Sequence, residues 1–238
     1  MTGHTVTDEP GVAAGVPRQS RAYIRRRGRL TVGQARALDE LAHYRLPADG
    51  GPLDLDHCFG RHGPVGLEIG FGMGHALLDW AEARPDWNLL GVEIYQPGVG
   101  ALLLGLERLV LANVRVIEAA AETVLADRLG AESLDEVRIF FPDPWPKKRH
   151  HKRRLIQPAF VALLAGRLRP GGRLWLATDW QPYAEWMQTV LDAEPRLEPD
   201  PEPEWPDVTA ASRVETRFEA RGRRLGHAIR DLRYRRKV

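Results

Sequence analysis

The segment Leu67-Glu68-Ile69-Gly70-Phe71-Gly72-Met73-Gly74 decides the fold, because it joins a short apolar run to a helical pattern through a glycine-rich turn. The run Val65–Ile69 predicts a buried strand, and Ala76–Ala83 predicts the helix that follows it. Glycines in such a turn let the chain reverse tightly and let a ligand approach the backbone closely. The segment therefore predicts a strand, a ligand-binding loop and a helix, which is the first unit of an α/β domain.

Short apolar runs alternate with helical patterns along the rest of the chain. Because crossover helices join parallel strands, this alternation predicts right-handed βαβ units in a doubly wound, mostly parallel sheet. A helix capped by Thr31 is expected over 31–44, and two final strands over 214–218 and 232–235. The other predicted strands are Leu89–Glu93, Val114–Ile117, Val137–Phe141 and Leu174–Thr178, with helices over 97–109, Ala119–Leu129, Leu155–Leu168 and Pro182–Leu191.

The composition predicts one folded domain with a tail. The chain has 238 residues, and 43% of them are hydrophobic, which is enough to bury a sizeable core. Residues 1–17 are rich in Gly, Ala, Thr and Pro without periodicity, so we expect a disordered tail followed by a single domain over 18–238. The segment 194–207 contains five prolines and predicts a loop or lid.

Several classes of protein are excluded. No apolar run approaches the roughly 18 residues that would span a bilayer, so we expect no membrane association. The single cysteine, Cys58, excludes a disulfide framework and fits a reducing compartment. The first ten residues carry no secretory signal, so we expect a cytoplasmic protein. Neighbouring His150 and His151 point in different directions and have no cysteine nearby, so we expect no metal site.

The charges are unevenly distributed, although the formal net charge is only +2. Six arginines and no acid lie between Arg18 and Arg29, and six of the eight residues Lys147–Arg154 are Lys or Arg. Nine basic residues follow from Arg217 onward, whereas eight acids lie between Ala184 and Asp207. Any one basic cluster could be a solvated face, but three of them favour a nucleic-acid surface.

Four carboxylates, Glu68, Glu93, Asp143 and Asp179, each end or closely follow a predicted strand. Ligands of open α/β sheets bind at that edge. Glu93 lies 19 residues after Gly74 and could accept both ribose hydroxyls of an adenosine, which NAD and S-adenosylmethionine share. A carboxylate at Glu68 disfavours a pyrophosphate and suits a cationic ligand, and the G-x-G-x-G spacing also favours S-adenosylmethionine.

The segment Phe140–Arg149 leaves the fourth predicted strand with the sequence Phe-Phe-Pro-Asp-Pro-Trp-Pro-Lys-Lys-Arg. Its prolines predict a stiff, extended exit that holds Asp143 and Trp145 at the mouth of the cofactor crevice. A flat base could stack on Trp145 while Asp143 accepts hydrogen bonds from its edge. The basic run that begins at Lys147 would then bind phosphates. We therefore expect a site for a target base here.

Taken together, these motifs resemble one family, the bacterial tRNA (guanine-N7)-methyltransferases. The glycine loop alone is shared by most class I methyltransferases, whereas the Pro-Asp-Pro-Trp segment with its basic run is highly specific. The resemblance extends from about Arg18 to the C-terminus. It rests on 25–31, Leu67–Gly74, 91–94, Phe140–Arg154, 177–180, Thr216–Glu219 and 221–227.

The resemblance implies an enzyme, a monomer or homodimer, that transfers a methyl group from S-adenosylmethionine to N7 of a guanine in the variable loop of tRNA. It assigns Asp143 to the active centre. It assigns the cofactor to Glu68, Gly70, Gly72, Gly74, Glu93 and Ala120; the substrate to Lys147, Asp179, Thr216, Arg217, Phe218 and Glu219; and the RNA to Arg149, His150, His151, Lys152, Arg153 and Arg154.

One position departs from the family pattern. Members usually carry Asp after the third strand, where it meets the adenine amino group, and by register that position is Ala120 here. The backbone N–H of Ala120 could still meet the adenine ring, and Glu118 or Glu122 could supply a carboxylate.

The residues alone leave three other functions open. An exocyclic-amine methyltransferase could use Asp143-Pro144-Trp145 much as adenine-N6 enzymes use a related motif. A nicotinamide oxidoreductase is disfavoured by Glu68 and the glycine spacing. A non-catalytic RNA-binding protein is disfavoured by Glu93, Asp143 and the glycine loop.

Overall fold

The computed structural model describes residues 28–200 and 228–238. In this part the chain forms a seven-stranded sheet in the order β3-β2-β1-β4-β5-β7-β6, which confirms the doubly wound fold. Strands β1 to β5 pair in parallel, while β7 runs antiparallel to both β5 and β6. The strands are β1 Val65–Ile69, β2 Asn88–Glu93, β3 Val114–Glu118, β4 Leu134–Phe140, β5 Leu168–Thr178, β6 Leu197–Pro199 and β7 Arg230–Arg236.

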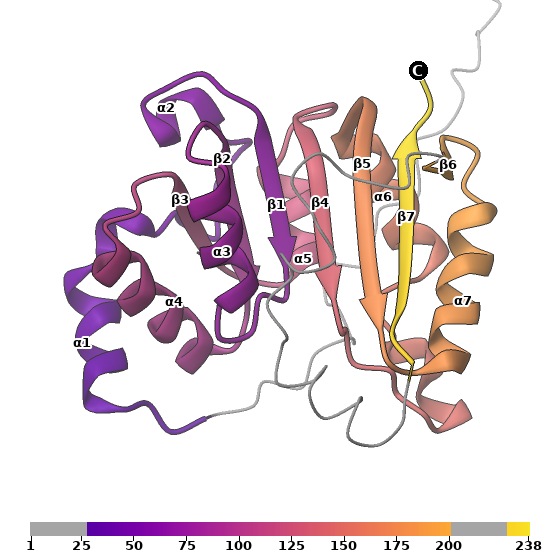
Figure 1. The fold of residues 1–238 in the computed structure, drawn as a ribbon, viewed down its shortest axis with the longest axis horizontal. Helices are drawn as coiled ribbons and strands as arrows, with labels where there is room; N and C mark the ends of the chain where they lie inside the picture. Colours follow the sequence, from indigo (N-terminus) through magenta and orange to yellow (C-terminus); the bar gives the residue numbers. More distant parts are fainter. Residues whose placement is uncertain (1–27, 201–227) are drawn as a thin grey trace, which may run out of the picture.

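Helices cover the sheet in two layers (Figure 1). Apolar residues of the first layer pack with β2 and β3, and those of the second layer pack with β1, β4 and β5. The first layer holds α1 Val32–Glu40, α3 His75–Ala83 and α4 Gln96–Leu109. The second holds α5 Ala121–Thr123, α6 Pro158–Arg167 and α7 Gln181–Asp192. Since successive crossovers change face between β3 and β4, the carboxyl ends of the central strands, β1 and β4, form the topological switch point at which ligands of such sheets bind.

The predicted N-terminal helix is shorter than expected but begins where predicted. Thr31 caps α1 with a reciprocal pair of bonds: its hydroxyl accepts from the Gln34 N–H, and the Gln34 side chain accepts from the Thr31 N–H. The helix ends at Glu40 and a 3₁₀ turn follows over Ala42–Tyr44.

Other boundaries differ for local reasons. The helix predicted from Leu155 starts only at Pro158, because proline fits the first helical turn, and a 3₁₀ helix occupies Lys148–Arg153. The helix predicted over 119–129 is α5 followed by wider π-type turns over Val124–Arg128. Helix α2, Leu55–Phe59, was not predicted, because five residues are too few for a periodic pattern.

The predicted loop or lid at 194–207 is wrong in its described part. Leu197–Pro199 forms β6, which pairs with β7 and is anchored by the buried side chain of Leu197. The predicted strand over 232–235 is confirmed as β7. Residues 201–207, the predicted tail at 1–17 and the predicted strand at 214–218 lie outside the described residues.

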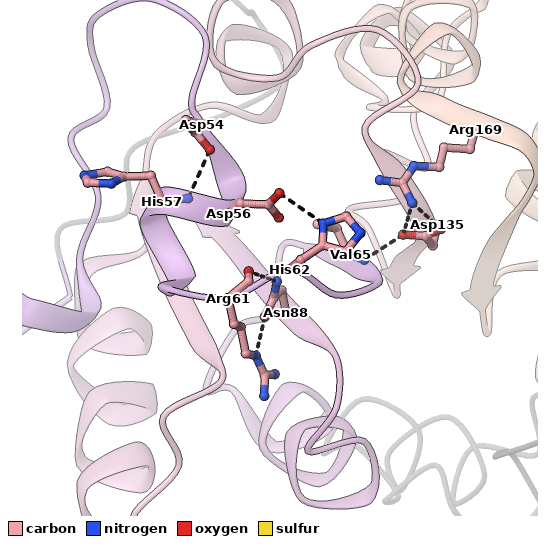
Figure 2. A network of polar contacts seen from close by, with 9 residues as sticks. All are labelled: Asp54, Asp56, His57, Arg61, His62, Val65, Asn88, Asp135 and Arg169. Atoms are coloured by element: carbon pink, nitrogen blue, oxygen red, sulfur yellow. Dashed lines mark hydrogen bonds and ion pairs between the residues drawn. The ribbon is translucent and has the colours of Figure 1, made fainter.

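A polar network closes the amino edge of the sheet (Figure 2). Asp135 accepts a hydrogen bond from the N–H of Val65 at 2.7 Å and pairs with Arg169 at 3.0 Å. Arg61 donates to Asn88, the first residue of β2, at 2.7 Å. These contacts involve the starts of four neighbouring strands, β2, β1, β4 and β5, so the charges at this edge stabilise the fold.

Candidate active site

The glycine loop leaves β1 at the carboxyl edge, as predicted. Gly70 and Gly72 have φ values of 72° and 56°, the left-handed region that favours glycine. A Cβ at either position would meet nothing within 4 Å, so open space adjoins the loop. On its other side the loop is held by α4, since a Cβ on Gly98 would lie 2.0 Å from the carbonyl oxygen of Gly72.

Glu68 is a buried carboxyl beneath this loop. It is 3% exposed, and no group among the described residues forms a hydrogen bond with its buried Oε2. Burial raises the pKa of Glu68 to about 8, although the charge of Arg138 on the neighbouring strand acts in the opposite direction. Burying an oxygen without a hydrogen-bond partner costs free energy of folding. Glu68 is therefore a candidate to bind a hydrogen-bond donor or a cation.

Glu93 ends β2 and lies against the glycine loop. Its Oε2 accepts from the Gly72 N–H at 2.9 Å, and its Oε1 accepts from the N–H groups of Ile94 and Tyr95 at 2.7 and 2.9 Å. Burial raises the pKa of Glu93 above its ordinary value, and the three N–H groups limit that rise. Because a carboxylate has about four acceptor sites, the fixed carboxylate keeps capacity for a further donor.

Ala120 lies at the N-cap of α5 in an extended conformation, with φ −68° and ψ 137°. Its neighbour Glu118 ends β3 and forms an ion pair with Arg45 at 3.1 Å. That pair offsets repulsion between Glu118 and Glu93, which are register partners on β3 and β2. The Glu118 carboxylate is therefore already engaged, which weighs against its standing in for the missing acid.

The Pro-Asp-Pro-Trp segment leaves β4 in a strained conformation. Phe141 and Trp145, on either side of Asp143, have φ values of 50° and 44°. Left-handed φ in a bulky residue costs on the order of 1–3 kcal/mol and persists only where surrounding contacts enforce it. The Phe141 N–H donates to the carbonyl of Ala177 on β5 at 2.8 Å, and the Asp143 side chain is exposed.

Aromatic and basic contacts surround Trp145. The Arg153 guanidinium lies 5.1 Å from the centre of the indole ring, and the His150 ring meets it edge-on at 5.7 Å. Partial burial, together with the positive charges of Arg153 and Arg149, lowers the pKa of His150. His150 is therefore neutral at pH 7, and the positive charge of this segment comes from its lysines and arginines.

Asp179 follows β5 directly, and α7 begins two residues later. Burial raises the pKa values of both Glu93 on β2 and Tyr183 on α7, and the charge of Asp143 adds to each rise. Because β1, β2, β4 and β5 run parallel, the strand ends that carry Glu68, Glu93, Asp143 and Asp179 lie at one edge of the sheet.

The basic run divides into exposed and buried members. Lys147, Arg149 and Lys152 are exposed, and His150, His151 and Arg153 are half-buried. Arg154 is only 4% exposed and donates to the carbonyl of Pro144 at 2.9 Å, so its side chain does not face solvent as an RNA contact requires. Thr216, Arg217, Phe218 and Glu219 lie outside the described residues.

The sequence motifs did not point to Arg138, a charged residue on the central strand β4. It pairs with Glu136 at 2.6 Å, and its guanidinium lies 3.7 Å from the Trp80 ring centre. The available signal was a charged residue inside the otherwise apolar run Val137–Phe141. Within 28–200 and 228–238, no three His, Cys, Asp or Glu side chains are grouped to hold a metal, and no helix is long and apolar enough to cross a membrane.

Known proteins resemble this chain at two levels. Residues 62–232 match a family described as putative methyltransferase. The tRNA (guanine-N(7)-)-methyltransferase of Alkalilimnicola ehrlichii is 51% identical over 228 residues, covering 94% of this chain and 96% of the relative. The protein of the same name from Halorhodospira halophila is 51% identical over 221 residues, covering 92% and 96%.

Solved structures with low sequence identity share the fold. The 16S rRNA methyltransferase KamB has a TM-score of 0.54 at 16% identity and covers 79% of this chain and 96% of its own. The aminoglycoside resistance methyltransferase NpmB1 has a TM-score of 0.52 at 18% identity, with 77% and 92% covered. The family match over most of the chain and the identity to the curated relatives show that the chain belongs to the tRNA (guanine-N(7)-)-methyltransferase family.

Proposed function

We propose that this chain methylates N7 of a guanine in the variable loop of tRNA, with S-adenosylmethionine as the methyl donor. The observation that carries the proposal is the presence at one edge of the sheet of a glycine loop, the buried Glu68, the half-buried Glu93 and the exposed carboxylate of Asp143. The basic surface around Lys147 and Lys152 suits the phosphates of an RNA.

The residues present fit S-adenosylmethionine. The open space beside Gly70 and Gly72 admits a ligand against the backbone. The unpaired Oε2 of Glu68 suits the cationic amino group, and Glu93 suits the ribose hydroxyls. In this proposal the bound cofactor supplies a methyl group on a positively charged sulfur, and the Ala120 backbone takes the adenine edge.

Asp143 and Asp179 would orient the guanine rather than remove a proton from it. N7 carries a free lone pair at neutral pH, so attack on the methyl group requires no general base. The two carboxylates can accept hydrogen bonds from N1–H and the exocyclic amine, and they stabilise the positive charge that guanine gains on methylation. Trp145 offers a ring face for stacking the base.

Transfer of a labelled methyl group to bulk tRNA, followed by nucleoside analysis, tests the proposal. N7-methylguanosine in the product supports it, and label located in the variable loop supports the finer assignment. Label in N6-methyladenosine would replace it with an exocyclic-amine methyltransferase. Asp143→Asn should lower turnover at saturating tRNA by roughly 10²-fold or more, a loss typical of an electrostatic contact. Turnover close to that of the parent would exclude a charge role for Asp143.

A further inference from the structure

Arg154 differs from every other member of the basic run because its side chain is buried. Only 4% of the residue is exposed, whereas Lys147 and Lys152 lie on the surface. Leu155 and Ile156, which follow it, are also buried. Arg154 is thus the point at which the run turns from the surface into the core.

The Arg154 guanidinium makes three contacts inside the protein. Its Nε donates to the carbonyl oxygen of Pro144 at 2.9 Å, and its Cζ lies 4.8 Å from the centre of the Tyr183 ring. Its Nη2 lies 3.1 Å from Nε2 of His151. Arginine can only donate, so His151 Nε2 is the acceptor in this contact. Among the described residues, no carboxylate forms an ion pair with Arg154.

The Pro144 carbonyl is a position at which a single hydrogen bond can fix the Pro-Asp-Pro-Trp loop. Pro142, Pro144 and Pro146 have no N–H, so this part of the loop has few backbone donors with which to fix itself. The loop is nevertheless strained at Phe141 and Trp145, and such a conformation requires outside contacts. The bond from Arg154 is one such contact, and it meets the loop between Asp143 and Trp145.

The other side of Arg154 is fixed by α7. The Tyr183 side chain is fully buried, and its hydroxyl accepts a hydrogen bond from the Ile156 N–H at 3.3 Å. Trp186, also on α7, donates to the Ile156 carbonyl at 2.7 Å. Because α7 begins two residues after Asp179, Arg154 links the loop that carries Asp143 to the helix that follows Asp179.

We propose that Arg154 is a positioning residue for methyl transfer, holding Asp143 and Trp145 in register with Asp179 through Pro144 and Tyr183, and that it does not bind tRNA phosphate. This inference rests on the proposed function. A planar guanidinium suits the task, because it can donate from Nε while its face lies on an aromatic ring, which an ammonium cannot do.

The test compares Arg154→Gln with Lys152→Gln, an exposed position in the same run. The readouts are the single-turnover rate at saturating tRNA and the dependence of tRNA affinity on salt. Arg154→Gln should lower the rate by roughly 10–100-fold, as expected for a displaced reacting group, and leave the salt slope unchanged. Lys152→Gln should lower the slope by about 0.7–0.9, the value for one lost phosphate contact. A slope lowered equally by Arg154→Gln, with its rate intact, would overturn the inference.

Arg154→Lys keeps the test decisive if the Gln variant fails to fold. Lysine retains the charge but not the planar fork, so the rate should stay low although phosphate contacts would survive. Full recovery of the rate by Arg154→Lys would refute the positioning role. Matching thermal melting and S-adenosylmethionine affinity show that each variant is folded. An inactive parent enzyme would instead refute the proposed function, so the two failures are distinguishable.

Discussion

The buried carboxyl of Glu68 makes the binding of S-adenosylmethionine depend on pH. Burial raises the Glu68 pKa to about 8, so the carboxyl is mostly protonated in the free protein at pH 6 and 7. A cationic amino group beside the unpaired Oε2 would favour the ionised form, and binding would then release a proton. Affinity should therefore rise with pH in this range.

The magnitude follows from the fraction of free protein that is already ionised. With a pKa of about 8 in the free protein and one well below 6 in the complex, affinity should rise about ninefold between pH 6 and pH 7. About 0.9 proton should be released per ligand at pH 7. The ligand's own amino group, with a pKa of roughly 7.7–8.0, stays protonated across this interval and adds little.

Titration calorimetry in buffers of different ionisation enthalpy measures both quantities. Glu68→Gln is the matched variant, because glutamine has the shape of glutamate but no titratable carboxyl group. The affinity of this variant for S-adenosylmethionine should be lower than that of the parent at pH 7 and should not change between pH 6 and pH 7. An affinity of the parent that does not change with pH, or a Gln variant that retains the dependence, would refute the assignment of Glu68 to the cationic group.

Three further changes test the structure. Between pH 4.5 and about 8 the folded state holds a proton on Glu68 that the unfolded chain releases, so the stability of the fold falls as pH rises through this window. Glu68→Gln should therefore raise the melting temperature more at pH 8 than at pH 5. An equal gain at both pH values would contradict this. Thr31→Ala should cost about 1 kcal/mol and lower the melting temperature by roughly 2–4 °C, because it removes the cap of α1; an unchanged melting curve would argue against the capping pair. Gly98→Ala places a methyl group 2.0 Å from the Gly72 carbonyl and should weaken S-adenosylmethionine binding by calorimetry, whereas Gly130→Ala, which meets no atom within 4 Å, should not.

Sequence could predict the parallel strands and the carboxylates at their ends, because both follow from local pattern. A run such as Val65–Ile69 is buried on both faces, and parallel strands bring their carboxyl ends to one edge. Glu93 and Asp143 could therefore be placed together without coordinates. The boundaries of the elements were less predictable. Strand β5 extends through Pro170 and Gly171, although these residue types normally end a strand, because the early part of β5 pairs with Leu134 across a register shift.

The role of Arg154 could not be predicted from sequence, because nothing local separates it from Arg153. The two residues are adjacent and chemically identical, yet one guanidinium lies over Trp145 and the other is buried on Tyr183. The difference depends on α7, which lies nearly thirty positions further along the chain. The left-handed backbone at Phe141 and Trp145 is also set by such contacts, since neither residue type favours it.

The charged groups at the two edges of the sheet differ in whether their polar atoms have partners, and this difference helps to distinguish groups that stabilise the fold from groups that serve function. At the amino edge, Asp135 is satisfied by Arg169 and a backbone N–H. At the carboxyl edge, Glu68 has a buried oxygen with no hydrogen-bond partner in the part of the chain that the structure describes, and Asp143 is exposed on a strained loop. Replacing Glu68 by an apolar residue would relieve the desolvation cost and strengthen the fold. A carboxyl that lowers stability beside a glycine loop gives the fold no advantage of its own, and this supports the proposal that Glu68 binds a ligand that brings the missing charge.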